Sequence, residues 1–201
     1  MTKEQIEKIG NLMTWLSQII PSLYLTKLLK LLYLVDENAV KQVGTPITWL
    51  TYKAWQFGPV PTVVYNDISF DDTRIFGDFI KAIREELRIP DTYQGKGYRI
   101  EPNKALDKSV FSPKEVAIIQ EVISHYGDKS TNEIVELLHS EHSLWDRVYQ
   151  EKKLEEHFKY AEYNTSPFEI DLTELIKGNE EKLSRYYAME EFIAFTETFS
   201  E

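Results

Sequence analysis

Two histidines have the spacing that most directly suggests chemistry. His139 and His142 are three residues apart, so a helix could direct both imidazoles at one metal ion. Structural and catalytic zinc sites need three or four protein ligands. The chain has no cysteine, and its other histidines, His125 and His157, have no recognisable ligand spacing to this pair. Since the helix dipole also favours histidine at a helix C-terminus, we predict no metal site here.

The sequence carries no other signature of catalysis. Its acidic pairs, such as Glu85-Glu86 and Glu155-Glu156, are neighbours in the chain, and neighbouring residues on a helix do not face each other. It contains no Gly-x-Ser-x-Gly motif for a nucleophilic serine, no Walker loop for phosphates and no dinucleotide fingerprint. We therefore predict a protein that is not an enzyme and has no cofactor. A small metal-dependent hydrolase centred on His139 and His142 is kept as an alternative.

Aromatic residues gather around a glycine-proline turn. The residues of this region that we predict to bind a partner are Trp49, Tyr52, Trp55, Phe57, Gly58, Pro59, Val60 and Tyr65. In a strand, successive side chains point to opposite faces, so both faces of residues 47–57 would carry aromatic rings. A small sheet has only one side toward the core, and the remaining rings would be exposed. Exposed Trp and Tyr are good anchors for a protein partner. The alternative is that all of these rings belong to the core.

The residues before this aromatic region are predicted to form a helix that supports it. Apolar residues cover nearly every side of residues 23–43, which is typical of a central helix with other elements packed around it. Ser22 is the predicted N-cap and Gly44 the predicted end of this helix. It is too short and too charged to span a membrane.

The aromatic region itself predicts a short strand or a hairpin. Residues 47–57 are rich in β-branched and aromatic side chains, and we expect them to pair antiparallel with residues 98–100. Gly58 to Pro61 would then form a rigid corner, because proline fixes φ and cannot donate a backbone hydrogen bond. A helix over residues 62–68 would follow.

The rest of the chain predicts further helices from the spacing of apolar residues and from capping boxes. They cover residues 3–20 and 74–88, and they begin after Ser112, Ser130, Ser143, Pro167 and Gly178. The predicted fold class is mainly α (α+β): a compact multi-helix domain around the central helix of residues 23–43, with a small antiparallel β element. With no repeat and no clear linker, residues 1–201 are predicted to be a single domain.

Composition limits the classes of partner that the chain is expected to bind. The 201 residues include 33 acidic and 23 basic side chains, for a net charge of −10. This charge favours a basic protein partner over nucleic acid, whose phosphates must be neutralised by Lys and Arg. Residues 112–139 could form a helix-turn-helix pair, but no Arg or Lys lies between Ser130 and His142. We therefore predict no nucleic-acid binding by the chain on its own. The N-terminus lacks the features of a signal peptide, so we expect a cytoplasmic protein with no membrane contact.

Several motifs follow one another in an order that resembles a known family. They are Lys27 to Tyr33, Gly44 to Thr48, Tyr52 to Val60, Ser112 to Glu115, Tyr126 to Ser130 with Glu133-Ile134, and Leu138 to Glu141 with Trp145. Together they resemble the Panacea domain, also called the SocA-like antitoxin domain of bacteria and phages. The family often has proline directly before this tryptophan, where the chain has Leu144.

This resemblance implies a compact α-rich domain over residues 23–145, with residues 150–201 as a C-terminal helical extension. It implies the antitoxin of a type II toxin–antitoxin pair, which neutralises a cognate protein toxin from an adjacent gene by direct binding. On the resemblance, His139 and Trp145 join the predicted partner-binding residues. Some relatives are implied to be adaptors that deliver a toxin to a protease. That role is kept as an alternative, with residues 190–201 as the handle.

Overall fold

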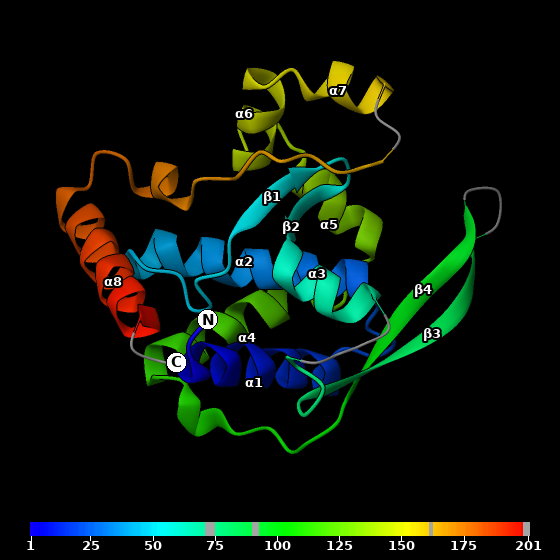
Figure 1. The fold of residues 1–201 in the computed structure, drawn as a ribbon, viewed down its shortest axis with the longest axis horizontal. Coiled ribbons are helices and arrows are strands. Elements are labelled where there is room, and N and C mark those ends of the chain that lie inside the picture. The colour runs from blue at the N-terminus through cyan, green and yellow to red at the C-terminus, as the bar shows by residue number, and fades with distance from the viewer. Residues whose placement is uncertain (71–74, 90–92, 161–162, 199–201) are drawn as a thin grey trace.

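The computed structural model describes residues 1–70, 75–89, 93–160 and 163–198. Within them the chain is mainly helical and has two small two-stranded antiparallel sheets, so the predicted fold class is confirmed (Figure 1). In chain order the elements are α1 (Lys3–Ile19), α2 (Leu25–Val43), β1 (Tyr52–Trp55), β2 (Gly58–Pro61), α3 (Thr62–Ser69), β3 (Ile80–Ile89), β4 (Tyr93–Pro102), the 3-10 helix η1 (Lys108–Val110), α4 (Pro113–Tyr126), α5 (Thr131–Leu138), α6 (Leu144–Glu151), α7 (Leu154–Tyr160), the 3-10 helix η2 (Leu172–Ile176) and α8 (Glu180–Thr198).

The central helix is α2, as predicted. Figure 1 shows it in the middle of the molecule, with α1 and α4 on one side and the β1–β2 hairpin and α5 on the other. The helix ends at Gly44, whose φ of 86° places it in the left-handed region that glycine adopts without strain. The predicted N-cap is wrong. Tyr24 holds that position without a side-chain cap, because its backbone pairs with Arg99 of β4 and this pairing fixes the start of the helix.

Local capping signals predict the other helix starts well. Ser112 and Ser130 each accept a hydrogen bond from the backbone N–H three residues later, and Glu115 and Glu133 complete the two capping boxes. Ser143 caps α6 in the same way. These helices therefore begin where the sequence predicts.

The predicted pairing of the strands is wrong. Tyr52–Trp55 pairs with Gly58–Pro61 across the two-residue turn Gln56-Phe57, so the glycine-proline stretch is a strand rather than a corner. Residues 98–100 lie in β4 and pair with β3. Proline is tolerated in β2 because the strand has a partner on one side only, and its other side faces α2.

The predicted helix over residues 74–88 is also wrong where the structure describes it. Residues 75–79 form a turn and Ile80–Ile89 is strand β3; Arg74 lies outside the described residues. The apolar residues of the stretch 74–88 recur every four positions, at 75, 79, 83 and 87. Four is close to one helical turn but is also a multiple of the two-residue strand period, so the spacing fits both structures. Pairing with β4 along the whole strand decides the outcome.

The C-terminal extension folds over the body of the molecule. It contains the short helices α7 and η2 and the long helix α8, which lies beside the end of α2 in Figure 1. Among the described residues, no helix combines the length and the apolar character needed to cross a membrane.

Candidate functional site

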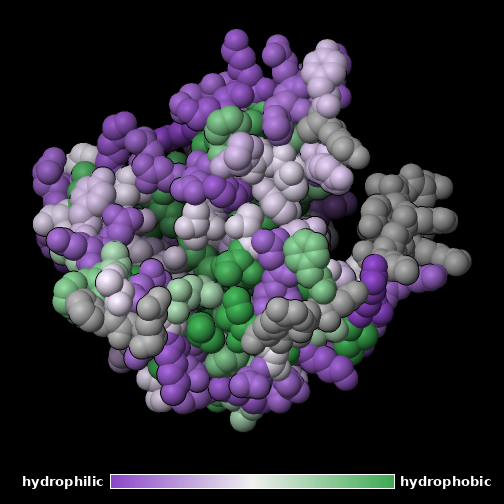
Figure 2. All heavy atoms as spheres, in the orientation of Figure 1, coloured by the Kyte–Doolittle hydropathy of each residue, from purple (hydrophilic) through white to green (hydrophobic). Residues whose placement is uncertain are grey.

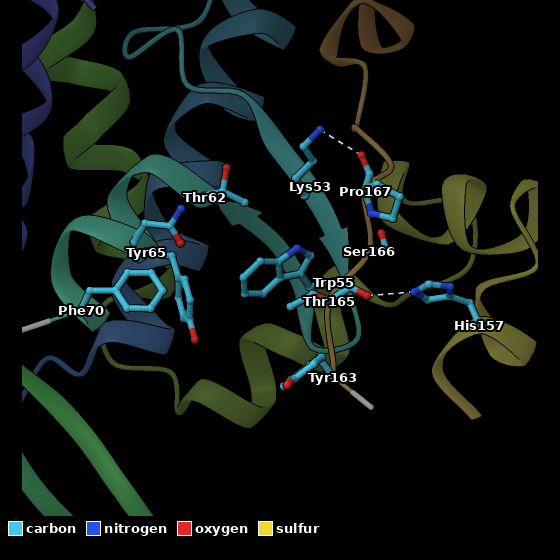
Figure 3. Close-up of a pocket in the computed structure, with 11 residues that line it drawn as sticks. Lys53, Trp55, Thr62, Tyr65, Phe70, His157, Tyr163, Thr165, Ser166 and Pro167 are labelled. Carbon is cyan, nitrogen blue, oxygen red and sulfur yellow. Dashed lines mark hydrogen bonds between the residues drawn. The ribbon is translucent and has the colours of Figure 1, made fainter. Parts of the chain in front are cut away.

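A groove opens beside the β1–β2 hairpin, where the predicted aromatic cluster lies (Figure 3). It has a volume of about 650 Å³. One wall comes from β1 and α3, and the other from α7 and the segment after it. The lining residues are Lys53, Trp55, Thr62, Tyr65, Asn66, Phe70, His157, Tyr163, Thr165, Ser166 and Pro167. The groove can therefore be built only after the C-terminal extension has folded onto the hairpin. We call it the hairpin groove.

Aromatic rings form the first wall. The Trp55 and Tyr65 rings pack edge to face, with centroids 4.8 Å apart and planes at 76°. Both residues are half-buried, whereas Phe70 at the end of α3 is 74% exposed. Phe57 at the tip of the hairpin is 53% exposed. The prediction that some rings of this region are exposed is confirmed, and such rings can take up apolar side chains of a partner.

The second wall is a strand-like segment, residues 164–170, that runs antiparallel along the free edge of β1. Phe168 O accepts from Ala54 N at 2.8 Å, Tyr52 O accepts from Ile170 N at 2.9 Å, and Asn164 O accepts from Gln56 N at 3.0 Å. These bonds satisfy backbone groups of β1 that would otherwise be open to solvent or to another chain.

Side chains reinforce this segment. The Ser166 hydroxyl donates to Ala54 O at 2.7 Å. Lys53 Nζ donates to Pro167 O at 2.9 Å (Figure 3). It also forms an ion pair with Glu169 at 2.7 Å. His157 Nε2 lies 2.9 Å from Thr165 O and ties α7 to the same segment. The extension is thus fastened to β1 at several points.

A ring stack supports the hairpin from behind. His139 and Trp145 stack with centroids 3.7 Å apart and planes at 12°, and Tyr149 continues the stack at 4.7 Å from Trp145. Trp145 Nε1 donates to Trp55 O at 2.8 Å. His139 and Trp145 therefore lie behind the groove, where they hold the backbone of Trp55 in place.

A buried lysine lies under β2. Lys30 on α2 is 1% exposed, and its ammonium donates to Pro59 O at 2.9 Å. Burial lowers the pKa of Lys30 to about 7. Burial and the nearby Lys30 charge also lower the pKa of His139 to about 4, and His139 Nε2 has no hydrogen-bond partner among the described residues. The hairpin therefore rests on two nitrogen bases whose charged forms are disfavoured.

Gly58 begins β2 directly above this lysine. Its φ is 98°, and a Cβ there would lie 3.3 Å from Lys30 Cε and 3.4 Å from Lys30 Nζ. We expect Gly58→Ala to lower the free energy of unfolding by about 2 kcal/mol, because it adds backbone strain and crowds the lysine. Gly178→Ala is the matched control, since Gly178 has a similar φ of 88° and no atom within 4 Å of the added Cβ. Urea denaturation should show the larger loss for Gly58→Ala; equal losses would mean that the contact with Lys30 costs nothing.

A second buried polar group fixes the chain before the hairpin. The Asp36 carboxylate accepts from the backbone N–H groups of Ile47 and Thr48 at 2.8 and 2.9 Å, from the Thr48 hydroxyl, and from Tyr52 OH at 2.8 Å. Burial raises the pKa of Asp36, and the hydrogen bonds from Thr48, Tyr52 and Ile47 oppose that rise. One carboxylate thus organises the loop that carries Trp49 and leads into β1.

The structure separates the predicted site residues into groups. Trp55, Phe57 and Tyr65 lie at or beside the hairpin groove. Tyr52 is 1% exposed and belongs to the core, and Gly58, Pro59 and Val60 of β2 are buried as well. Trp49 is half-buried on another part of the surface, where its ring packs 5.1 Å from Tyr186 of α8.

Sequence reasoning missed the second wall of the groove and one ring of the first. Residues 164–170 gave no strand signal, and their partner β1 lies more than 100 positions earlier in the chain. Phe70 follows α3 directly, and a large aromatic residue between two polar neighbours, Ser69 and Asp71, was the available signal.

The two histidines of the alternative metal site have different surroundings. His139 is stacked on Trp145, whereas the His142 side chain is 81% exposed and pairs with Glu141 at 3.6 Å. Within the described ranges, no group of three or more His, Asp or Glu side chains is placed to hold a metal ion.

Comparison with known families gives one match. The model of the family described as antitoxin SocA-like, Panacea domain, matches residues 28–146, which is more than half of the chain. This confirms the resemblance found in the sequence motifs, and the match ends before the segment that forms the second wall of the groove. Comparisons with curated proteins and with solved structures found no match.

Proposed function

The chain belongs to the SocA-like Panacea family of antitoxins, and we propose that it neutralises a cognate protein toxin by binding it directly. Membership in an antitoxin family implies a toxin as the partner. The cytoplasm is the proposed place of action, and an adjacent gene is the proposed source of the toxin.

The hairpin groove is the surface that we assign to the toxin. The observation that carries this assignment is the set of exposed rings around it: Phe57 is 53% exposed, Phe70 74% and Tyr163 67%. Exposed aromatic rings beside a preformed groove are typical of the residues that supply most of the binding energy in protein interfaces. A stable complex needs about 1,600 Å² of total buried surface, so the toxin would extend beyond the groove itself.

The two walls would then have different roles. Trp55 and Tyr65 lie within the part of the chain that matches the family, whereas Tyr163 and Thr165 lie outside it. We infer that the first wall supplies a general docking surface and that the extension adjusts it to one toxin.

The test uses the double variant Phe70→Ser with Tyr163→Ser. The protein from the adjacent gene is expressed with the tagged chain, and growth and recovery on the tag are measured. We expect the double variant to bind about 100-fold more weakly than the parent chain and to lose the rescue of growth, because each ring anchors part of the interface. Ile19→Ser is the matched control, since Ile19 is 53% exposed and lies at the end of α1, away from the groove. The parent chain, the double variant and Ile19→Ser should melt at the same temperature, which would show that the substitutions leave the fold intact.

Three outcomes would contradict this proposal. Full binding and rescue by the double variant would mean that the toxin uses another surface. Rescue without recovery of the toxin on the tag, dependent on a cytoplasmic protease, would favour the adaptor alternative. A neighbouring protein that does not arrest growth would remove the toxin from the proposal altogether.

A further inference from the structure

Helix α8 exposes more large apolar side chains than any other described element. Tyr187, Met189, Phe192 and Phe195 are 53%, 42%, 60% and 62% exposed. The helix lies outside the residues that match the family, and none of its residues is buried. A soluble helix normally turns such side chains toward the core, so their exposure calls for an explanation.

A second groove lies between α8 and the start of α1. It has a volume of about 780 Å³ and is lined by Thr2, Glu4, Gln5, Lys8, Ile47, Trp49, Met189, Phe192, Ile193, Phe195 and Thr196. We call it the α8 groove. Met189, Phe192, Ile193 and Thr196 recur at positions i, i+3, i+4 and i+7, which is the ridge that a third helix can pack against. Figure 2 shows hydrophobic side chains on the surface between α8, α3 and α1, and past Ile193 the surface dips into a smaller depression of about 360 Å³.

The α8 groove is held open by contacts at both ends of the helix. Near its start, Arg185 donates to Val43 O at 2.8 Å and Tyr186 packs on Trp49 at 5.1 Å. Near its end, Glu197 pairs with the N-terminal amine of Met1 at 3.2 Å. The groove is therefore preformed, which lowers the entropic cost of binding.

The rim of the α8 groove is acidic. From Tyr186 to Thr198 the helix carries three glutamates and no Lys or Arg. Glu4 of α1 lines the groove and Glu190 of α8 lines the adjoining depression. Both are exposed, and among the described residues neither forms an ion pair. The groove is also lined by one lysine, Lys8, whose ammonium is paired with Glu115 at 2.5 Å. An apolar floor with unpaired carboxylates at its edge complements a helix with one apolar face and a cationic border.

We propose that the α8 groove is a second protein-binding site, and that its occupant is a cationic amphipathic helix of a partner protein. The net charge of −10 would also steer such a helix toward this surface. The proposal does not depend on the role of the hairpin groove.

The test measures binding of a fluorescein-labelled helical peptide of leucine and lysine, with leucines on one face, by anisotropy with the full chain. A peptide with glutamate in place of lysine is the matched probe. We expect the cationic peptide to bind at least tenfold more tightly than the acidic one, and Phe192→Ser to weaken it roughly tenfold. The double variant Glu4→Lys with Glu190→Lys should reverse the preference. Phe70→Ser, on the hairpin groove, should leave peptide binding unchanged.

Other results would overturn the proposal. Equal binding of both peptides, or binding that ignores Phe192→Ser in a variant that melts like the parent, would remove the groove as a site for a cationic helix. Dimerisation of the chain that Phe192→Ser abolishes would assign the groove to a second copy. Binding that appears only after residues 199–201 are deleted would assign it to the chain's own C-terminus.

Discussion

Replacing Asp36 by alanine is expected to lower the free energy of unfolding by about 4 kcal/mol or more. The carboxylate accepts four hydrogen bonds, and it is fully buried beneath the loop before β1. Without it, two backbone N–H groups and the hydroxyls of Thr48 and Tyr52 would be buried without acceptors, and each unsatisfied group costs about 1–3 kcal/mol. Since small domains have about 5–15 kcal/mol of stability in total, much of the margin would be lost.

Asp36→Asn is the matched variant, because it keeps the shape of the side chain. Its amide oxygen can still accept from Ile47 N and Thr48 N, whose present partner is a single oxygen, Oδ1. Its NH₂ group would face the hydroxyls of Thr48 and Tyr52, and a hydroxyl can accept as well as donate. We therefore expect less than half of the loss seen for alanine. Urea denaturation at pH 7.5 measures both, and a loss below about 1 kcal/mol for Asp36→Ala would show that water replaces the carboxylate.

This interaction also shows what the sequence could not predict. Helix α2, which contains Asp36, is predictable because apolar residues cover nearly all of its sides. The helix starts at Ser112 and Ser130 are predictable because a capping box involves residues only three positions apart. The role of Asp36 depends on residues 47–52 folding back over the helix, which no local pattern specifies. A charged residue in an apolar helix was the one signal that it has a buried partner.

The hairpin groove was predictable only in part. The alternation in β1 correctly separates Tyr52 and Ala54, which are buried, from Lys53 and Trp55, which line the groove. The pairing of β1 with residues 164–170 joins segments far apart in the chain. Local sequence patterns do not say which of several extended segments pairs with the edge of β1. The same ambiguity produced the wrong partner for residues 98–100. Strand pairing is decided by tertiary contacts rather than by propensity.

Lys30 is expected to make the protein more stable as the pH increases from about 7 to about 9.5. Burial lowers its pKa to about 7, whereas a lysine in the unfolded chain keeps its proton until about pH 10.4. Between these values the unfolded chain binds more protons than the folded chain, so the free energy of unfolding increases by up to about 1.4 kcal/mol per pH unit. Lys30→Met removes the titration and keeps most of the apolar stem, so its stability should lack this increase.

The measurement compares urea denaturation at pH 7.5 and pH 9.0. The parent chain should gain about 2 kcal/mol more than Lys30→Met over this interval. Lys27→Met is the control on the same helix: the pKa of Lys27 is also lowered by burial, but Lys27 is partly exposed and donates to Gly127 O. It should retain most of the gain. The upper limit of pH 9.0 keeps the buried tyrosines Tyr33 and Tyr52, whose pKa values are raised by burial, in their neutral form.

The protonation state of Lys30 also affects the hairpin groove. Lys30 donates to the backbone of β2, and β2 pairs with the strand that carries Trp55. If the ammonium loses its proton near neutral pH, the hydrogen bond to Pro59 O becomes a neutral one, and neutral hydrogen bonds are weaker than charge-assisted ones. The hairpin would then be held chiefly by its packing on α2 and by Trp145. Equal gains for the parent chain and Lys30→Met would instead mean that Lys30 stays charged. Pro59 O and the His139 ring nitrogen would then have to stabilise a buried ammonium, at a cost that the rest of the core must offset.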